Sequence, residues 1–115
     1  MSMQEQLPAL LDAVLQRNRF LPMIGDSMEP TLRNGDLVAV VPVDRFRCDG
    51  LYVFAFLGEP DVYRCSANFH DGGIDIYKDN GRYGRYTLSP ESFRQAVIGQ
   101  VLATCNIIDR TLLEL

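Results

Sequence analysis

Turn signals recur at short intervals along most of this 115-residue chain, and they constrain its fold more than any other feature. Asn34-Gly35, Asp49-Gly50 and Asp79-Asn80-Gly81 are examples, and short runs rich in β-branched and aromatic residues lie between such turns. These intervals are too short for the helical crossovers that join parallel strands. The sequence therefore predicts a mainly β domain built on a bent antiparallel sheet.

The strands and helices can be placed from the same pattern. Six segments are predicted to be strands: 37–43, 51–56, 61–65, 74–77, 85–88 and 97–107. Ser89 followed by Pro90 is typical of a helix start and predicts one helical turn through Phe93. Near the N-terminus, a capping-box pattern and leucines at helical spacing predict one amphipathic helix over residues 1–19, which leaves residues 20–115 as the β domain.

Composition and charge exclude several classes of protein. The formal charge is −4, which argues against nonspecific binding to nucleic acid or to an anionic membrane. No apolar run approaches the roughly 20 residues of a membrane-spanning helix. The three cysteines are odd in number and widely spaced, and His70 is the only histidine, so we expect free thiols in a reducing cytoplasm and neither a metal nor another cofactor.

Residues 25–36, Gly-Asp-Ser-Met-Glu-Pro-Thr-Leu-Arg-Asn-Gly-Asp, carry the strongest functional signal. A flexible glycine precedes Ser27, and Pro30 constrains the turn that follows. Such a segment can expose a hydroxyl beside unpaired backbone N–H groups, as a serine nucleophile with an oxyanion hole requires. Spacing alone favours an ordinary turn serine, because loops are rich in serine, proline and glycine.

The whole segment, continuing through Asn34-Gly35-Asp36-Leu37-Val38, resembles the serine box of the Ser–Lys peptidases. These are the LexA/UmuD self-cleaving family with its phage repressors, together with the type I signal peptidases. Downstream, residues 49–54, 79–83 and 97–101 are similar, in order, to the family's glycine-led strand, its Asp-Asn-x-x-Tyr turn and its closing strand.

This resemblance implies a LexA-like bent β-sheet domain that pairs as a homodimer. It also implies Ser27 as the nucleophile and the Met28 backbone N–H as an oxyanion donor. In the family, a buried and neutral lysine takes the proton of the serine hydroxyl. The signal-peptidase branch fits less well, because its members are usually anchored in a membrane.

The expected lysine is replaced in this sequence. The family's Val-Lys-Arg-Leu strand corresponds to Val62-Tyr63-Arg64-Cys65, which puts Tyr63 or Arg64 at the position of the base. Arginine does not deprotonate in proteins, and a buried tyrosinate without a cation is unfavourable. Lys78 is the only lysine in the chain, and a lysine in a turn beside an aspartate is expected to face solvent in its protonated form.

Two functions follow from these observations. The first is a catalytically impaired regulatory or dimerisation domain of a phage-repressor-like transcriptional regulator, with a protein or peptide as a further partner. The alternative is an active serine peptidase that uses Ser27 with Lys78 or another non-standard base. Residues 1–26 contain neither Ala-Gly nor Cys-Gly, the bonds at which self-cleaving relatives are cut.

Nucleic-acid binding is a third hypothesis. One predicted helix cannot form a helix-turn-helix domain, so we expect any DNA-binding part to lie outside this sequence and no direct contact of this chain with nucleic acid or membrane. Residues 77–86 nevertheless interleave aromatic and basic side chains with a local charge of +2. A tight hairpin with solvated arginines explains that segment equally well.

Overall fold

The structure is a computed structural model that describes residues 19–105, 108, 109 and 111. Along these residues the elements are β1 (Arg19–Pro22), β2 (Leu37–Pro42), β3 (Gly50–Phe54), β4 (Asp61–Ala67), β5 (Ile74–Tyr77), β6 (Arg85–Leu88), α2 (Pro90–Ala96) and β7 (Val97–Cys105). Within the described residues the strands form one sheet in the order β1-β2-β7-β3-β4-β5-β6, and every neighbouring pair is antiparallel. The prediction of a mainly β, antiparallel domain is confirmed.

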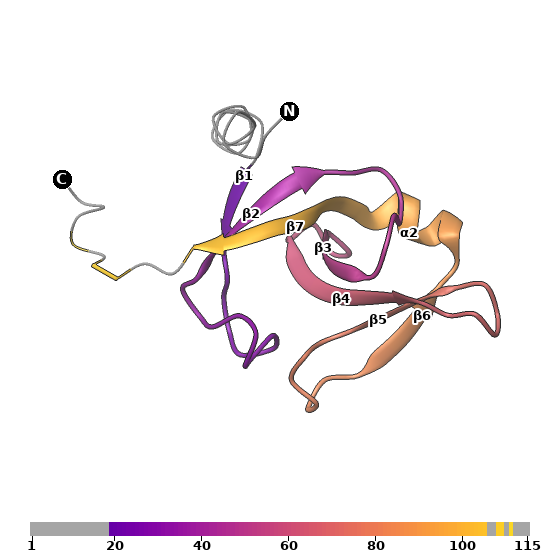
Figure 1. Cartoon of the computed structure of the whole chain (residues 1–115), viewed down its shortest axis with the longest axis horizontal. Coiled ribbons are helices and arrows are strands. Elements are labelled where there is room, and N and C mark those ends of the chain that lie inside the picture. The colour runs from indigo at the N-terminus through magenta and orange to yellow at the C-terminus, as the bar shows by residue number, and fades with distance from the viewer. Residues whose placement is uncertain (1–18, 106–107, 110, 112–115) are drawn as a thin grey trace, which may run out of the picture.

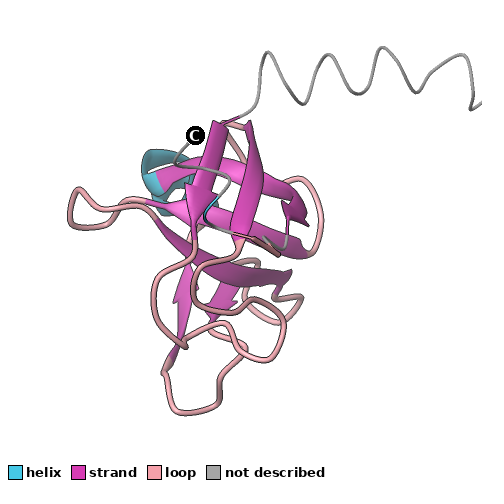
Figure 2. Cartoon of the chain, turned by 90° about the vertical axis from the view of Figure 1, so that its left-hand side faces the viewer, coloured by secondary structure: helices cyan, strands magenta, loops and turns pink. Residues whose placement is uncertain are grey.

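The sheet is strongly curved (Figures 1 and 2). Its register shifts between Ala39 and Val40, where β2 pairs with β7, and again between Val53 and Phe54, where β3 pairs with β7. Bulges of this kind bend a strand and increase its twist. Because β7 carries both irregular pairings, the sheet curls about that strand.

The six predicted strands are all present, with ends that differ by one or two residues within the described part of the chain. Strand β1 was not predicted, and it begins at Arg19, which we had placed in the first helix. It has four residues and ends in Pro22, which is tolerated because β1 lies at the edge of the sheet. The rest of the predicted N-terminal helix, residues 1–18, lies outside the described residues.

Helix α2 begins as predicted and runs longer than the single predicted turn. Ser89 caps it, and the Ser89 hydroxyl accepts a hydrogen bond from the Ser92 backbone N–H at 3.1 Å. The helix buries Phe93 against the sheet.

Two hydrophobic cores lie on opposite faces of the sheet, because alternate side chains of a strand point to opposite faces. In β3, Val53 belongs to one core, whereas Tyr52 and Phe54 belong to the other. The first core includes Met28 and leucine and valine side chains from the loop after β1 and from β2. The second core contains three aromatic side chains, including that of Phe93 from α2, together with Cys65, Ile74 and Ile76. The segment that contains Ser27 is thus tied to one particular face of the sheet.

Within the part of the chain described, no helix is long and apolar enough to cross a membrane. Cys48, Cys65 and Cys105 are free thiols, and His70 lies exposed in a loop, as expected from the sequence. The described residues contain no group of three or more histidine, cysteine, aspartate or glutamate side chains arranged to hold a metal ion.

Candidate active site

Ser27 lies in a loop between β1 and β2, residues 23–36, which we call the serine loop. Its two ends are held together, since the Met23 N–H donates to the Asp36 carbonyl and the Gly35 N–H donates to the Met23 carbonyl, both at 2.7 Å. Gly25 adopts a positive φ of 87°, a conformation that side chains disfavour, and its N–H donates to the Asn34 side chain at 2.8 Å. The glycine that precedes the serine therefore has a structural reason to be there.

The serine loop is anchored by the side chains that flank Ser27. Met28 and Leu32 are fully buried in the core of this face, and the Leu32 N–H donates to the Met28 carbonyl at 2.9 Å. Ser27 itself is half-buried. No acceptor is found for the Met28 N–H among the described residues, so this donor lies beside Ser27 unpaired. An anchored serine next to a free N–H has the local form that covalent catalysis needs.

The turn that follows β5, residues 78–83, packs against the serine loop, and we call it the lysine turn. The Asn80 N–H donates to the Ser27 carbonyl at 3.0 Å, and the Asn80 side-chain amide donates to the Asp26 carbonyl at 3.1 Å. The Tyr83 hydroxyl donates to the Asp26 carboxylate at 2.7 Å. Both segments lie below the sheet in the view of Figure 1. Residues some fifty positions apart in the sequence are thereby fixed next to each other.

Asp79 joins the lysine turn, strand β4 and the serine loop. Its carboxylate takes two hydrogen bonds from the Arg64 guanidinium, at 2.6 and 2.8 Å, and another from the Thr31 hydroxyl. The bond from Arg64, followed by that from Thr31, lowers the pKa of Asp79 despite partial burial. Arg64 is thus occupied by a structural ion pair, and bonding to Asp79 raises its own pKa. These contacts agree with the expectation that Arg64 is not a base.

Lys78 differs from its sequence-based expectation. We expected a solvated turn lysine, and this was wrong: the Lys78 side chain is only 6% exposed. Lys78 directly follows β5, one step beyond the register pair Arg64–Tyr77, so it lies across from Tyr63 on the neighbouring strand. Its Nζ is 3.8 Å from the centroid of the Tyr63 ring. The only lysine of the chain therefore reaches Tyr63, one of the two residues that the resemblance to the family places at the position of its lysine.

Two oxygen atoms accept hydrogen bonds from the Lys78 amine. Its Nζ donates to the Val62 carbonyl at 2.6 Å and forms an ion pair with Asp61 Oδ2 at 2.7 Å. Burial lowers the pKa of Lys78, and the hydrogen bond and charge of Asp61 oppose that shift without cancelling it. Within the described residues there is no hydrogen bond between Lys78 Nζ and Ser27 Oγ.

Tyr63 stays a neutral phenol at physiological pH. Burial raises its pKa above the ordinary value, and the negative charge of Asp61 raises it further. Its ring packs edge-on against the rings of Phe54 and Phe56. Tyr63 therefore supplies an apolar surface next to the lysine amine.

A groove is bordered by Asp61. It consists of two cavities of about 260 and 340 Å³ that share Ile24, Glu59, Pro60 and Asp61. The remaining lining residues are apolar or aromatic: Leu21, Pro22, Met23, Val53 and Val62 in the smaller cavity, and Phe54, Phe56, Leu57 and Tyr63 in the larger. An apolar groove that includes Met23 and Ile24 of the serine loop, and Tyr63 next to the buried lysine, is suited to binding part of a peptide.

The match to known families agrees with this geometry. Residues 3–102 match the family model described as Peptidase S24-like. The chain belongs to the peptidase S24-like family. No curated protein matches the chain. The resemblance to LexA/UmuD-type peptidases inferred from the serine box is therefore confirmed at the level of the family, and the β domain is a serine-peptidase fold.

Of the residues singled out from the sequence, the structure brings Tyr63 and Lys78 into direct contact and connects the lysine turn to Ser27. Sequence reasoning missed two residues, Asp61 and Asp26. The sequence contained a signal for Asp61, which directly precedes the Val-Tyr-Arg-Cys strand, but nothing in it showed that Lys78 would be its partner. Tyr77, in the aromatic and basic segment 77–86, packs under Arg85, whose guanidinium carbon is 4.1 Å from the ring centroid.

Proposed function

We propose that the chain is a serine peptidase in which Ser27 is the nucleophile and Lys78 is the general base. One observation carries this proposal: the buried Lys78 Nζ lies 3.8 Å from the Tyr63 ring. Positions 63 and 78 face each other across β4 and β5, so a lysine at either one directs its amine toward the same region. On this view the base has moved to the end of the adjacent strand, at Lys78, and has not been lost.

The distance between base and nucleophile is limited by the chain path. Asn80 is hydrogen-bonded to Ser27 at 3.0 Å and is two residues from Lys78, which corresponds to at most about 7 Å of extended chain. A lysine side chain has four rotatable methylene groups with which to cover the remaining distance. The proposal requires that rotation of this side chain away from Asp61 bring its amine to the Ser27 hydroxyl.

The residues then have the following roles. Neutral Lys78 accepts the proton of the Ser27 hydroxyl while Oγ bonds to the carbonyl carbon of the scissile peptide. The Met28 N–H donates to the oxyanion that forms, and this stabilises the tetrahedral intermediate. Protonated Lys78 returns its proton to the leaving amine as the C–N bond breaks, and water then hydrolyses the Ser27 ester. Burial supports this role, because it lowers the pKa of Lys78 toward the range in which an amine acts as a base.

The test uses a fluorophosphonate, which labels activated serines, and a library of peptides. We expect the wild-type protein to be labelled and to cleave at least one peptide, and Ser27→Ala to do neither. Removing one member of a buried ion pair destabilises a protein when it leaves a buried charge unpaired. Lys78→Met should fold, because the Asp61 carboxylate that loses its partner is 46% exposed and accessible to water. Unchanged labelling and cleavage by Lys78→Met would refute the proposal.

A second candidate function is a catalytically impaired regulatory and dimerisation domain of a cytoplasmic, phage-repressor-like transcriptional regulator. The contacts of Lys78 with Asp61 and Val62 favour it, because they engage the amine in bonds other than one to Ser27. The exposed end of β7, residues 102–105, offers a surface for a second copy of the chain. This function predicts a dimer in sedimentation experiments together with no fluorophosphonate labelling of Ser27.

A further inference from the structure

The Lys78 ammonium is fully engaged in the structure. A lysine ammonium has three N–H donors. Two of them are directed at Asp61 and at the Val62 carbonyl, and the Nζ also lies over the face of the Tyr63 ring, an additional favourable site for a cation. In this arrangement the lysine is held as a cation and is unable to accept a proton from Ser27. Some event must release it before the proposed peptidase can act.

Asp61 is the contact that an outside molecule can reach. Its side chain is 46% exposed, whereas that of Lys78 is only 6% exposed. One carboxylate oxygen is fixed by the Val62 N–H at 2.9 Å, and the other pairs with Lys78. Asp61 also lines both cavities of the groove, so a molecule bound there would contact its carboxylate.

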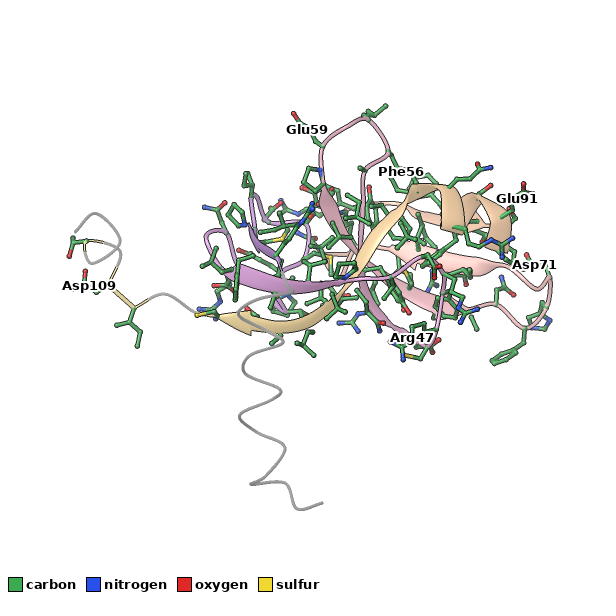
Figure 3. All side chains as sticks on the ribbon, turned by 90° about the horizontal axis from the view of Figure 1, so that it is seen from above. Arg47, Phe56, Glu59, Asp71, Glu91 and Asp109 are labelled. Carbon is green, nitrogen blue, oxygen red and sulfur yellow. The ribbon has the colours of Figure 1, made fainter. Side chains whose placement is uncertain are left out.

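The charges of the groove indicate the kind of molecule that fits. Its two ionisable residues other than Tyr63 are Glu59 and Asp61, both acidic, and the rest of its lining is apolar or aromatic. Ile24, which the cavities share, is 80% exposed. Glu59 lies on the turn that stands out between β3 and β4 in Figure 3, with its carboxylate directed outward. An extended peptide with a basic side chain next to apolar ones complements this surface.

We propose that Asp61 is a latch that keeps Lys78 from Ser27, and that the basic side chain of a peptide bound in the groove opens the latch by pairing with Asp61. This inference rests on the proposed function, and it assigns Asp61 as a positioning residue that also determines substrate preference. A guanidinium suits the role best, because it binds a carboxylate through two parallel hydrogen bonds. Once Asp61 is engaged by the peptide, Lys78 loses its counter-ion inside a desolvated site and gives up one proton to solvent. The neutral amine is then free to take the proton of the Ser27 hydroxyl.

The experiment compares peptides that are identical except for arginine or citrulline at one position, which is moved along the peptide. Citrulline has nearly the shape of arginine without its charge. At one position we expect the wild-type protein to cleave the arginine peptide at least about tenfold faster, a difference equivalent to about 1.4 kcal/mol. Asp61→Asn should cleave the citrulline peptide faster than the wild-type protein does and should discriminate little between the two. Glu91→Gln, which removes an exposed carboxylate from α2, is the matched control and should keep the wild-type preference.

The possible failures are distinguishable. Cleavage that depends on Ser27 and Lys78 but shows no preference for arginine would overturn the latch and leave the peptidase intact. The same conclusion would follow if Asp61→Asn slowed the cleavage of the citrulline peptide. Absence of both cleavage and fluorophosphonate labelling in the wild-type protein and in Asp61→Asn would overturn the proposed function, and the latch with it.

Discussion

The strongest test of the site moves the proposed base from position 78 to position 63 on the neighbouring strand. Lys78→Met removes the amine, and loss of a general base should reduce kcat/KM by about 10²–10⁴-fold. Adding Tyr63→Lys should raise kcat/KM at least about tenfold above that of Lys78→Met. A general base contributes well over one order of magnitude to the rate even when it is imperfectly placed. The geometry supports this recovery: Lys78 Nζ already lies 3.8 Å from the centroid of the ring that the new lysine would replace.

The assay is cleavage of one peptide by four proteins: the wild type, Lys78→Met, Lys78→Met with Tyr63→Lys, and Lys78→Met with Tyr63→Arg. Arginine restores a positive charge at position 63 but does not deprotonate, so the last protein should remain as slow as Lys78→Met. Equal recovery by lysine and arginine would show that charge, and not proton transfer, is what position 63 supplies. No recovery by lysine, in a protein with unchanged thermal unfolding, would show that positions 63 and 78 are not interchangeable and would refute our reasoning about the site.

Three further predictions concern the surroundings of the site. Asp79→Asn should lower the free energy of unfolding in urea by about 1.5–3 kcal/mol, the usual contribution of hydrogen bonds to a charged group. That difference from the wild type should shrink in acid, because the Arg64 guanidinium lowers the pKa of Asp79, and its stabilising effect is lost as the pH falls through this lowered value. In the pH profile of kcat/KM, activity should rise as Lys78 deprotonates, and Asp61→Asn should move this rise to lower pH because Asp61 raises the pKa of the lysine; a rise at unchanged pH would contradict the pairing. In thiol titration of the folded protein, Cys65 should stay unreactive while the other two cysteines react, because burial raises its pKa to about 12, and rapid reaction of all three would contradict that burial.

The strands were predictable because turn residues separate them at intervals that only antiparallel pairing allows. Strand β1 was missed because it has only four residues and ends in Pro22, a residue that argues against a strand. Its place in the sheet depends on pairing with β2, which is a nonlocal contact. The serine loop was found because its signal is local, since a glycine, a serine and a proline at fixed spacing all lie within one turn.

The environment of Lys78 was not predictable for the same reason. From the sequence it is a charged residue beside an aspartate, in a segment that reads as a turn. Its burial depends on the register between β4 and β5, which places it against Tyr63, and on the carboxylate of Asp61 from a different strand. Whether a lysine is a surface charge or a candidate base is thus decided by pairing between strands, and periodicity along one strand carries no information about it.

The lysine turn has a consequence for how this chain tolerates change. The resemblance to the family aligns its lysine with Tyr63 or Arg64, both within β4, the strand that follows the β3–β4 hairpin. Here the proposed base and the residues that form hydrogen bonds to the serine loop from the lysine turn all lie within six consecutive residues, 78–83. Insertions and deletions at residues 57–59 therefore leave unchanged the length of chain between the proposed base and the residues that hold the serine loop. The tip of the hairpin that borders the groove is thereby free to diversify in length and sequence, and with it the range of molecules that the groove accepts.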